Sequence, residues 1–267
     1  ASNLAKAKKK LDAAKIPYRE KVLVGPIAET VVSHAEKVKA DLLSFVPDAR
    51  VELLPHPLYD HFGARIPTAE ARRQLGIAEG RRVLLFFGFI RDYKGLDLLI
   101  EAMAKLPKDI VLVIAGEPYR DITKYHDAIQ RLGMKDRIVD HIRYIADQEV
   151  PRFFSAADVV VLPYRSATQS GITAIAQHFA TPIIATDVGG LKELVADGRT
   201  GIIVPTADPV AIAAGVERFY TMGPGAFAEG LARLREELSW ERFAQRLVEF
   251  AGSLGAATTV RRPNHSA

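Results

Sequence analysis

The 267-residue sequence predicts an α/β fold in which a parallel β-sheet carries helices on both faces. From Arg82 to about residue 220, short apolar runs alternate with helical stretches, as in a chain of βαβ units. The first run, residues 83–87, is continuously apolar, which is typical of a strand buried on both faces. After a loop bounded by glycines, residues 96–103 place apolar side chains at helical spacing. A short αβα unit is expected ahead of the sheet.

The composition is that of an ordinary globular protein, with 48% hydrophobic and 25% charged residues. The absence of cysteine excludes a disulfide framework and a cysteine-based metal site, and it agrees with a reducing compartment. No run of 18 apolar residues is present, and the first residues lack the apolar core of a signal peptide. We therefore expect a cytoplasmic protein without a membrane-spanning helix.

Positive charge is concentrated at the start of the chain. Residues 1–21 hold seven Lys and Arg against two acids, a balance of +5 in a chain whose net charge is +4. Such a basic segment is most often a solvated helix face, and the alternative is peripheral contact with an anionic membrane surface. Nucleic acid is not expected as a partner, because only these residues support it.

Residues 1–50 are expected to form the N-terminal αβα unit, with residues 42–46 fitting either a strand or a helix end. Its predicted elements are a helix at 4–14, a strand at 21–24 and a helix at 28–40. Residues 51–80 are expected to be a linker. The linker begins with a strand at 51–54 and contains a helix at 69–75 with Thr68 as N-cap.

Three side chains that could ligate a metal lie close together in this linker: His56, Asp60 and His61. Pro55 and Pro57 prevent a helix that would place them on one face. We therefore expect a surface or interface loop here, and no metal site.

Residues 81–222 are expected to form the main domain, followed by helices within 223–257 and a mobile tail at 258–267. The predicted strands are 83–87, 110–115, 137–140, 159–162, 182–185 and 201–204. The predicted helices are 95–105, 121–132, 148–156, 171–179, 190–196 and 208–220, with two more at 225–238 and 240–254. Right-handed crossovers would bring the loops after the strands to one edge of the sheet, where ligands bind in such folds.

The loop after the first strand of this domain has the features of a phosphate site. Gly88 ends the strand, Arg91 and Lys94 supply positive charge, and Gly95 precedes a helix whose N-terminus offers unpaired N–H groups. A plain turn with two solvated cations explains the loop equally well. It is not a Walker A loop, because the Gly-Lys-Ser/Thr ending is missing.

The loop after the fourth strand is rich in hydroxyls and leads directly into a helix. Either Thr168 or Ser170 is an ordinary N-cap, or the N–H groups of Gly171 and Ile172 point at a diphosphate. The other loops carry Gly116, Tyr144 and Glu193, each of which also fits an ordinary structural role. All these loops are predicted at one edge, which favours a site for a phosphorylated ligand.

Several separated motifs resemble those of one enzyme family, in the same order: GFIRDYKGLDLLIEA, LVIAGE, ADVVVLPYRSATQSG and FATPIIATDVGGLKELVADGRTGIIVP. They are similar to the C-terminal, donor-binding domain of retaining family 4 glycosyltransferases, whose GT-B architecture consists of two Rossmann-like domains. The resemblance implies a Rossmann-like sheet that binds a nucleotide-diphosphate sugar, with UDP or GDP as its nucleotide and without a metal or cofactor. Residues 1–45 show a weaker likeness to universal stress proteins.

The resemblance also assigns site residues. The donor diphosphate would be bound at Gly88, Arg91, Lys94, Ser170, Gly171 and Ile172. The base, ribose and sugar would lie near Gly116, Glu117, Ile142, Tyr144, Ile145, Thr168, Gln169 and Glu193. A catalytic residue and the acceptor are not identifiable.

Two departures from the family pattern stand out. The Glu-x7-Glu signature is absent, since its positions hold about Ala167 and Ile175, and no acid lies between Ser166 and Ala180. An SATQSG loop is nevertheless found in one branch of the family. Only some 80 residues precede Arg82, too few for the family's acceptor domain. We therefore expect a fragment, a reduced protein or a recombined one, with a missing partner domain or self-association.

Two functions follow as hypotheses. The leading one is the donor domain of a hexosyl-type glycosyltransferase, and the alternative is a nucleotide-binding module that transfers no sugar. A dehydrogenase is disfavoured, because no Gly-x-Gly-x-x-Gly follows a strand.

Overall fold

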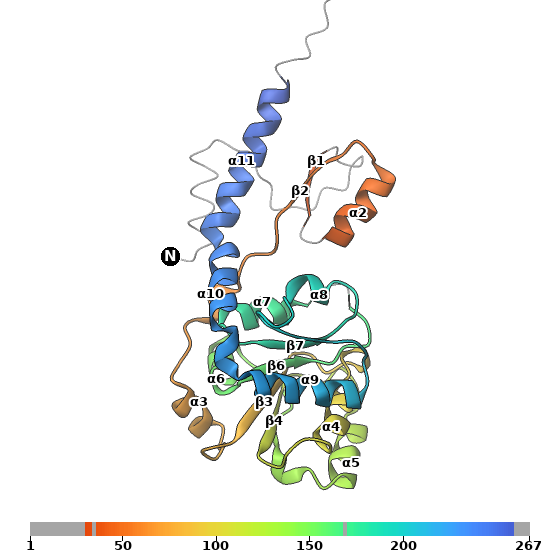
Figure 1. Ribbon diagram of the computed structural model, residues 1–267, viewed down its shortest axis with the longest axis vertical. Helices are drawn as coiled ribbons and strands as arrows, with labels where there is room; N and C mark the ends of the chain where they lie inside the picture. The colour runs from red at the N-terminus through yellow and green to blue at the C-terminus, as the bar shows by residue number, and fades with distance from the viewer. Residues whose placement is uncertain (1–29, 34–35, 168–169, 259–267) are drawn as a thin grey trace, which may run out of the picture. The chain divides into compact units, whose positions relative to one another are not determined.

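The apolar runs form a six-stranded parallel sheet in the computed structural model (Figure 1). The structure describes residues 30–33, 36–167 and 170–258. The chain divides into two units, one made of residues 59–235 and the other of residues 1–58 together with 236–267. The larger unit contains the whole six-stranded sheet.

The sheet of the larger unit has the strand order β5-β4-β3-β6-β7-β8, with every neighbouring pair parallel. Its strands are β3 (Arg82–Phe87), β4 (Ile110–Ala115), β5 (Ile138–His141), β6 (Val159–Leu162), β7 (Ile183–Thr186) and β8 (Gly201–Val204). The chain builds outward from β3 to β5, then returns to the other side of β3 and continues to β8. The order therefore reverses between β3 and β6, and ligands bind at such a switch point in open α/β sheets.

Helices cover both faces of this sheet because its strands are apolar on both faces. In β3, Leu84 and Phe86 belong to one buried cluster, and Val83, Leu85 and Phe87 belong to the other. The first cluster packs under α4 (Leu96–Met103), α5 (Thr123–Arg131) and α9 (Pro209–Met222). The second packs under α3 (Thr68–Gln74), α6 (Val150–Ala156), α7 (Gly171–His178) and α8 (Leu191–Leu194).

The smaller unit holds a two-stranded parallel sheet, β1 (Thr30–Ser33) with β2 (Arg50–Leu53), and helix α2 (Glu36–Phe45) between them. It also contains α11 (Trp240–Thr258). Within this unit, the indole N–H of Trp240 donates to the carbonyl oxygen of Leu58 at 3.0 Å, and Arg246 pairs with Glu52 at 2.7 Å. Helix α10 (Ala228–Glu237) contains the division between the two units.

Short 3₁₀ turns complete the described chain: η1 (Asp60–Phe62), η2 (Asp92–Lys94), η3 (Lys135–Arg137), η4 (Asp147–Glu149) and η5 (Pro224–Phe227). None of the helices in the described part of the chain is long and apolar enough to cross a membrane.

The predicted α/β fold is confirmed, and each of the six strands predicted after residue 81 is present within one residue of its expected limits. The predicted helix at 28–40 is wrong. Residues Thr30–Ser33 instead form β1, whose β-branched side chains pair in register with β2, and α2 begins only at Glu36.

Thr68 is also not an N-cap. It is the first helical residue of α3, and Pro67 occupies the cap position without a side-chain hydrogen bond. The helix at 4–14, the strand at 21–24, the basic segment and the C-terminal tail lie outside the described residues, as does most of the stretch that resembles universal stress proteins.

Candidate functional site

Two loops leave the sheet at the point where the strand order reverses. The first runs from the end of β3 through η2 to α4, and the second runs from the end of β6 to α7. A Cβ atom placed on Gly95 would lie 2.0 Å from the carbonyl oxygen of Pro163, so the two loops pack at backbone distance. Gly95 also has a φ of +68°, a left-handed conformation that favours glycine.

A third loop, which follows β4, also packs at backbone distance against the loop after β3. A Cβ atom on Gly116, which follows β4, would lie 2.0 Å from the carbonyl oxygen of Gly88. The N–H of Gly88 in turn donates to the carbonyl oxygen of Ala115 at 2.9 Å. Glycine at these positions lets the loops after β3, β4 and β6 meet at one edge of the sheet.

Lys94 lies at the centre of this edge with only 7% of its surface exposed. Its ammonium nitrogen is 5.7 Å from the centre of the Tyr164 ring. Burial, together with the positive charge of Arg91, lowers the pKa of Lys94 from 10.5 to about 8. Among the described residues no acid pairs with this ammonium group. A buried cation without an anion is costly, which indicates that the site is built to receive one.

The N-terminus of α7 lies beside Lys94. A Cβ atom on Gly88 would be 2.9 Å from Cδ1 of Ile172 and 3.3 Å from Nζ of Lys94, so these three residues meet. The hydroxyl of Ser170 lies 3.1 Å from the Tyr164 hydroxyl and caps no N–H of the helix. Among the described residues no side chain accepts a hydrogen bond from the N–H of Gly171 or Ile172, so both groups can face a ligand.

Tyr164 connects the lysine to this helix terminus. The ring is 1% exposed and packs edge-on against Tyr93, with 6.0 Å between ring centres. Burial raises the pKa of Tyr164 to about 12, although its contact with Ser170 acts in the opposite direction. The phenol is therefore neutral at pH 7 and does not neutralise Lys94.

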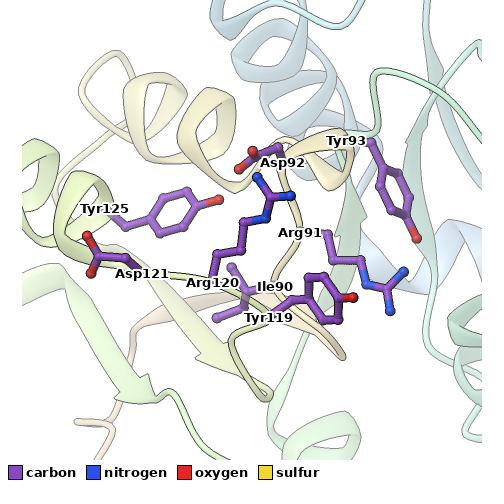
Figure 2. A pocket seen from close by; sticks show the side chains of 8 residues that line it. All are labelled: Ile90, Arg91, Asp92, Tyr93, Tyr119, Arg120, Asp121 and Tyr125. Atoms are coloured by element: carbon purple, nitrogen blue, oxygen red, sulfur yellow. The ribbon is translucent and has the colours of Figure 1, made fainter.

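Arg91 lies at the outer side of the same loop. Its guanidinium carbon is 4.5 Å from the centre of the Tyr119 ring and 5.6 Å from that of Phe89. Figure 2 shows Arg91 and Tyr119 side by side at one end of a cavity of about 310 Å³. Asp121 and Tyr125 lie at the opposite end, and Arg120 extends between the two ends toward Asp92. The cavity adjoins the loop that carries Lys94 but is not lined by Lys94 itself.

The loop after β5 is fixed by charged side chains. Arg143 donates to both carboxylate oxygens of Glu149, at 2.8 and 2.7 Å, and to the carbonyl oxygen of Tyr144 at 2.7 Å. These bonds from Arg143 are the main reason that the pKa of Glu149 falls to about 2. The N–H of Ile142 donates to Asp140 at 2.8 Å. Tyr144 is 65% exposed, whereas Ile145 belongs to the buried core.

The structure thus brings together Gly88, Lys94, Ser170 and Ile172, which are among the residues predicted to hold a diphosphate. Gly116 is buried at the same edge, and Glu117 and Glu193 are exposed on the loops after β4 and β7. Thr168 and Gln169 lie outside the described residues. No three acidic, histidine or cysteine side chains group as metal ligands anywhere in the described part of the chain.

Two residues at this edge are absent from the predicted site, Tyr164 and Arg165. Both follow β6 directly, and their position after a buried strand is the only signal in the sequence. Arg165 forms hydrogen bonds to the loop that carries Lys94, and these depend on the strand order.

Solved structures share the fold. Sucrose-phosphate synthase from Thermosynechococcus elongatus superposes with a TM-score of 0.70 at 24% identity, covering 96% of this chain and 64% of that one. The Anabaena protein HepE, determined in complex with UDP, gives a TM-score of 0.75 at 19% identity, covering 85% and 64%. The C-terminal domain of LpcC, a glycosyl transferase group 1 family protein from Francisella tularensis, gives 0.54 at 22% identity, covering 64% and 94%. These likenesses establish the α/β fold of one GT-B half.

The sequence also matches curated relatives. The D-inositol 3-phosphate glycosyltransferase of Geodermatophilus obscurus is 32% identical over 188 residues, which are 67% of this chain and 42% of that protein. The enzyme of the same name from Corynebacterium diphtheriae is 27% identical over 235 residues, covering 83% and 53%. The chain thus spans about half the length of these relatives. Residues 67–237 match the family described as glycosyl transferases group 1, and the chain therefore belongs to this family.

Proposed function

We propose that this chain is the donor-binding part of a glycosyltransferase and that it holds a nucleotide-diphosphate sugar where β3 and β6 diverge. The observation that carries the proposal is the buried Lys94 ammonium group, which lies beside the N-terminus of α7 and has no acidic partner among the described residues. Family membership supplies the reaction class. HepE has been determined with UDP and with UDP-glucose, which supports a ligand of this kind here.

The diphosphate is bound by charge and by backbone donors. Lys94 neutralises one phosphate, Arg91 approaches from the outer side, and the N–H groups of Gly171 and Ile172 share the remaining charge. In the whole enzyme the same groups stabilise the nucleoside diphosphate as it leaves, which is electrostatic catalysis of glycosyl transfer. The exposed Tyr144 offers an aromatic face to the base, and the buried Ile145 contributes only its backbone.

Two further parts of the proposal, and one alternative to it, rest on the sequence alone. Transfer with retention of the anomeric configuration follows from the resemblance to family 4, and nuclear magnetic resonance of the product of the whole enzyme tests it. A cytoplasmic location agrees with the absence of cysteine. A module that binds nucleotides without sugar transfer is the second candidate, since no acid lies between Ser166 and Ala180.

Thermal unfolding of this chain with UDP, GDP, ADP, TDP and NAD tests the proposal. A ligand at about 100 times its Kd stabilises a protein by about 2.7 kcal/mol. For a chain of this size, at about 2–4 °C per kcal/mol, the melting temperature should rise by roughly 5–10 °C. The rise should disappear in Lys94→Met, which keeps the volume of the side chain and removes its charge. Lys105→Met, at an exposed position away from the site, should keep the full rise.

Three outcomes would contradict the proposal. A rise with a nucleoside diphosphate that persists in Lys94→Met would place the ligand elsewhere. A rise with NAD alone would indicate a dehydrogenase. If none of the five compounds changes the melting temperature, the chain is not a donor-binding domain.

A further inference from the structure

The side chain of Arg165 joins the two loops that meet at the switch point of the sheet. Its guanidinium group donates to both carboxylate oxygens of Asp97, at 2.9 and 2.6 Å. The same group donates to the carbonyl oxygen of Asp92 at 2.8 Å. The backbone N–H of Arg165 donates to the carbonyl oxygen of Tyr93 at 2.7 Å. One residue after β6 thus makes four hydrogen bonds to the segment that follows β3.

The residues that accept these four bonds lie on both sides of Lys94 in the sequence. Asp92 and Tyr93 are the first two residues of η2, whose third residue is Lys94, and Asp97 lies in the first turn of α4. The carbonyl oxygen of Pro163 fills the space that a Cβ atom on Gly95 would occupy. The turn that carries the lysine is therefore held before and after Lys94 by the residues that lead to α7.

The charges of the pair explain why Arg165 is not itself a free cation for a ligand. Burial alone would raise the pKa of Asp97, but the hydrogen bonds and charge of Arg165 keep it below its ordinary value. The carboxylate is therefore ionised at pH 7, and it occupies both arms of the guanidinium group. Arg165 has its acidic partner within the protein, whereas Lys94 has none among the described residues.

The pair is too exposed to serve mainly as a support for the core. The side chains of Arg165 and Asp97 are 41% and 39% exposed, and ion pairs of that exposure typically contribute about 0–1 kcal/mol to stability. Their bidentate geometry fixes direction as well as distance. The main effect of these bonds is to fix the position of the loop after β3 relative to the loop after β6.

We propose that Arg165 is a positioning residue for the donor site, an inference that rests on the proposed function. It holds the turn that carries Lys94 against the loop that leads to α7. The Lys94 ammonium group and the first N–H groups of α7 then face the same diphosphate before the ligand arrives. Binding in an arranged site avoids the free-energy cost of ordering these loops around the ligand.

Equilibrium binding of UDP and GDP to four forms of this chain tests the inference: wild type, Arg165→Gln, Asp97→Asn and Arg218→Gln. Partners that orient the ligands of a metal site contribute about 10–100-fold in affinity, and we expect a loss of roughly 10-fold for Arg165→Gln. Arg218→Gln is the matched control. Arg218 pairs with Asp197 in the same bidentate manner, at 2.9 and 3.0 Å, with side chains 47% and 45% exposed, but away from this site.

Asp97→Asn separates positioning from a direct effect of charge. If Arg165 acts by position, this substitution breaks the same Arg165–Asp97 ion pair and weakens nucleotide binding as Arg165→Gln does. If Arg165 acts by its charge on the phosphates, losing the negative charge of Asp97 strengthens binding instead. Circular dichroism of each variant at the binding temperature shows whether the chain is folded, and only folded variants are compared.

The inference is supported if Arg165→Gln and Asp97→Asn both lose affinity for the nucleotide while Arg218→Gln binds it as the wild type does. It is overturned if Arg165→Gln keeps wild-type affinity, or if Asp97→Asn binds more tightly. A wild-type chain that binds no nucleoside diphosphate overturns the proposed function first and this inference with it.

Discussion

Lys94 combines two properties that seldom occur together in a side chain: it is buried, and it lacks an acidic partner among the described residues. Proteins bury a charge where it is paired, or where a ligand will pair it. Its neighbours are the Tyr164 ring, the backbone at Gly88 and the side chain of Ile172. None of these three groups carries a negative charge, so they do not compensate the buried positive charge.

Replacing this lysine should therefore stabilise the chain while it removes binding. A pKa lowered from 10.5 to about 8 corresponds to roughly 3 kcal/mol between the charged and neutral forms. We expect Lys94→Met to gain up to about that amount in unfolding free energy at pH 7, measured with urea. Lys105→Met should change it by less than about 0.5 kcal/mol, as exposed substitutions usually do. A large loss of stability in Lys94→Met would mean that the ammonium group is satisfied in the folded chain.

The pH dependence of stability follows from the same shift. The folded chain releases the Lys94 proton near pH 8, whereas the unfolded chain keeps it until about pH 10.5. Between these values the unfolded chain binds more protons, so the free energy of unfolding rises with pH. The advantage of Lys94→Met over wild type should be constant below pH 8 and shrink as pH rises toward 10.5. A difference that stays constant over this range would contradict the shifted pKa.

Binding should change in the opposite direction. The diphosphate requires the charged form of Lys94, so affinity for UDP should fall as pH rises above 8, while the wild-type chain becomes more stable relative to Lys94→Met. The phosphates of UDP are fully ionised by then, since the second phosphate pKa is about 6. Titration calorimetry at several pH values measures this trend, and an affinity that does not change between pH 7.5 and 9.5 would exclude Lys94 as a ligand.

At the scale of elements, the contact between the loop after β3 and the loop after β6 depends on a glycine. Gly95 and Gly133 both adopt left-handed φ angles, +68° and +63°. A Cβ atom on Gly133 meets nothing within 4 Å, whereas one on Gly95 would overlap the carbonyl oxygen of Pro163. The two positions therefore share the backbone conformation and differ in the space around them.

Substituting each glycine by alanine separates these two effects. Gly133→Ala should cost about 1–2 kcal/mol, the penalty of the left-handed conformation alone. Gly95→Ala should cost clearly more, because the two loops must also move apart, and it should weaken UDP binding by displacing Lys94. Urea unfolding and UDP titration measure both effects. Equal losses of stability in the two variants would show that the contact with Pro163 is not tight.

The six strands of the larger unit could be predicted because each is a short apolar run bounded by turns. Such a run is the sequence pattern typical of a strand buried on both faces. Strand β1 could not be predicted from the sequence. Val31, Val32 and Ala35 also fit the apolar stripe of a helix, and the pairing with β2 that decides between the two involves residues about twenty positions away.

The site was predictable to the extent that it depends on position after a strand. Lys94 and Ser170 follow β3 and β6, and the sequence alone indicates that such loops share an edge. The role of Arg165 depends on which strands are neighbours in the sheet, and the sequence pattern does not predict that strand order. The side chain of Ile145 belongs to the buried core, so only its backbone could meet a ligand, and the prediction that it lies near the base remains a prediction.

At the scale of the whole molecule, two independent divisions of the chain agree. The larger unit covers residues 59–235, and the family match covers residues 67–237. Every described residue of the candidate site lies within both ranges. The smaller unit contributes none of them, although it contains the only tryptophan, Trp240. All described residues of the candidate site therefore belong to one unit.

A chain of residues 59–237 alone should for that reason fold and bind the nucleoside diphosphate as tightly as the 267-residue chain does. Its sheet has both faces covered by its own helices, and the comparable domain of LpcC was determined as a separate domain. Circular dichroism would establish folding, and titration calorimetry would compare the two affinities. The same chain carrying Lys94→Met is the control and should bind no nucleotide. A folded 59–237 chain with clearly weaker binding would show that residues of the smaller unit take part in the donor site.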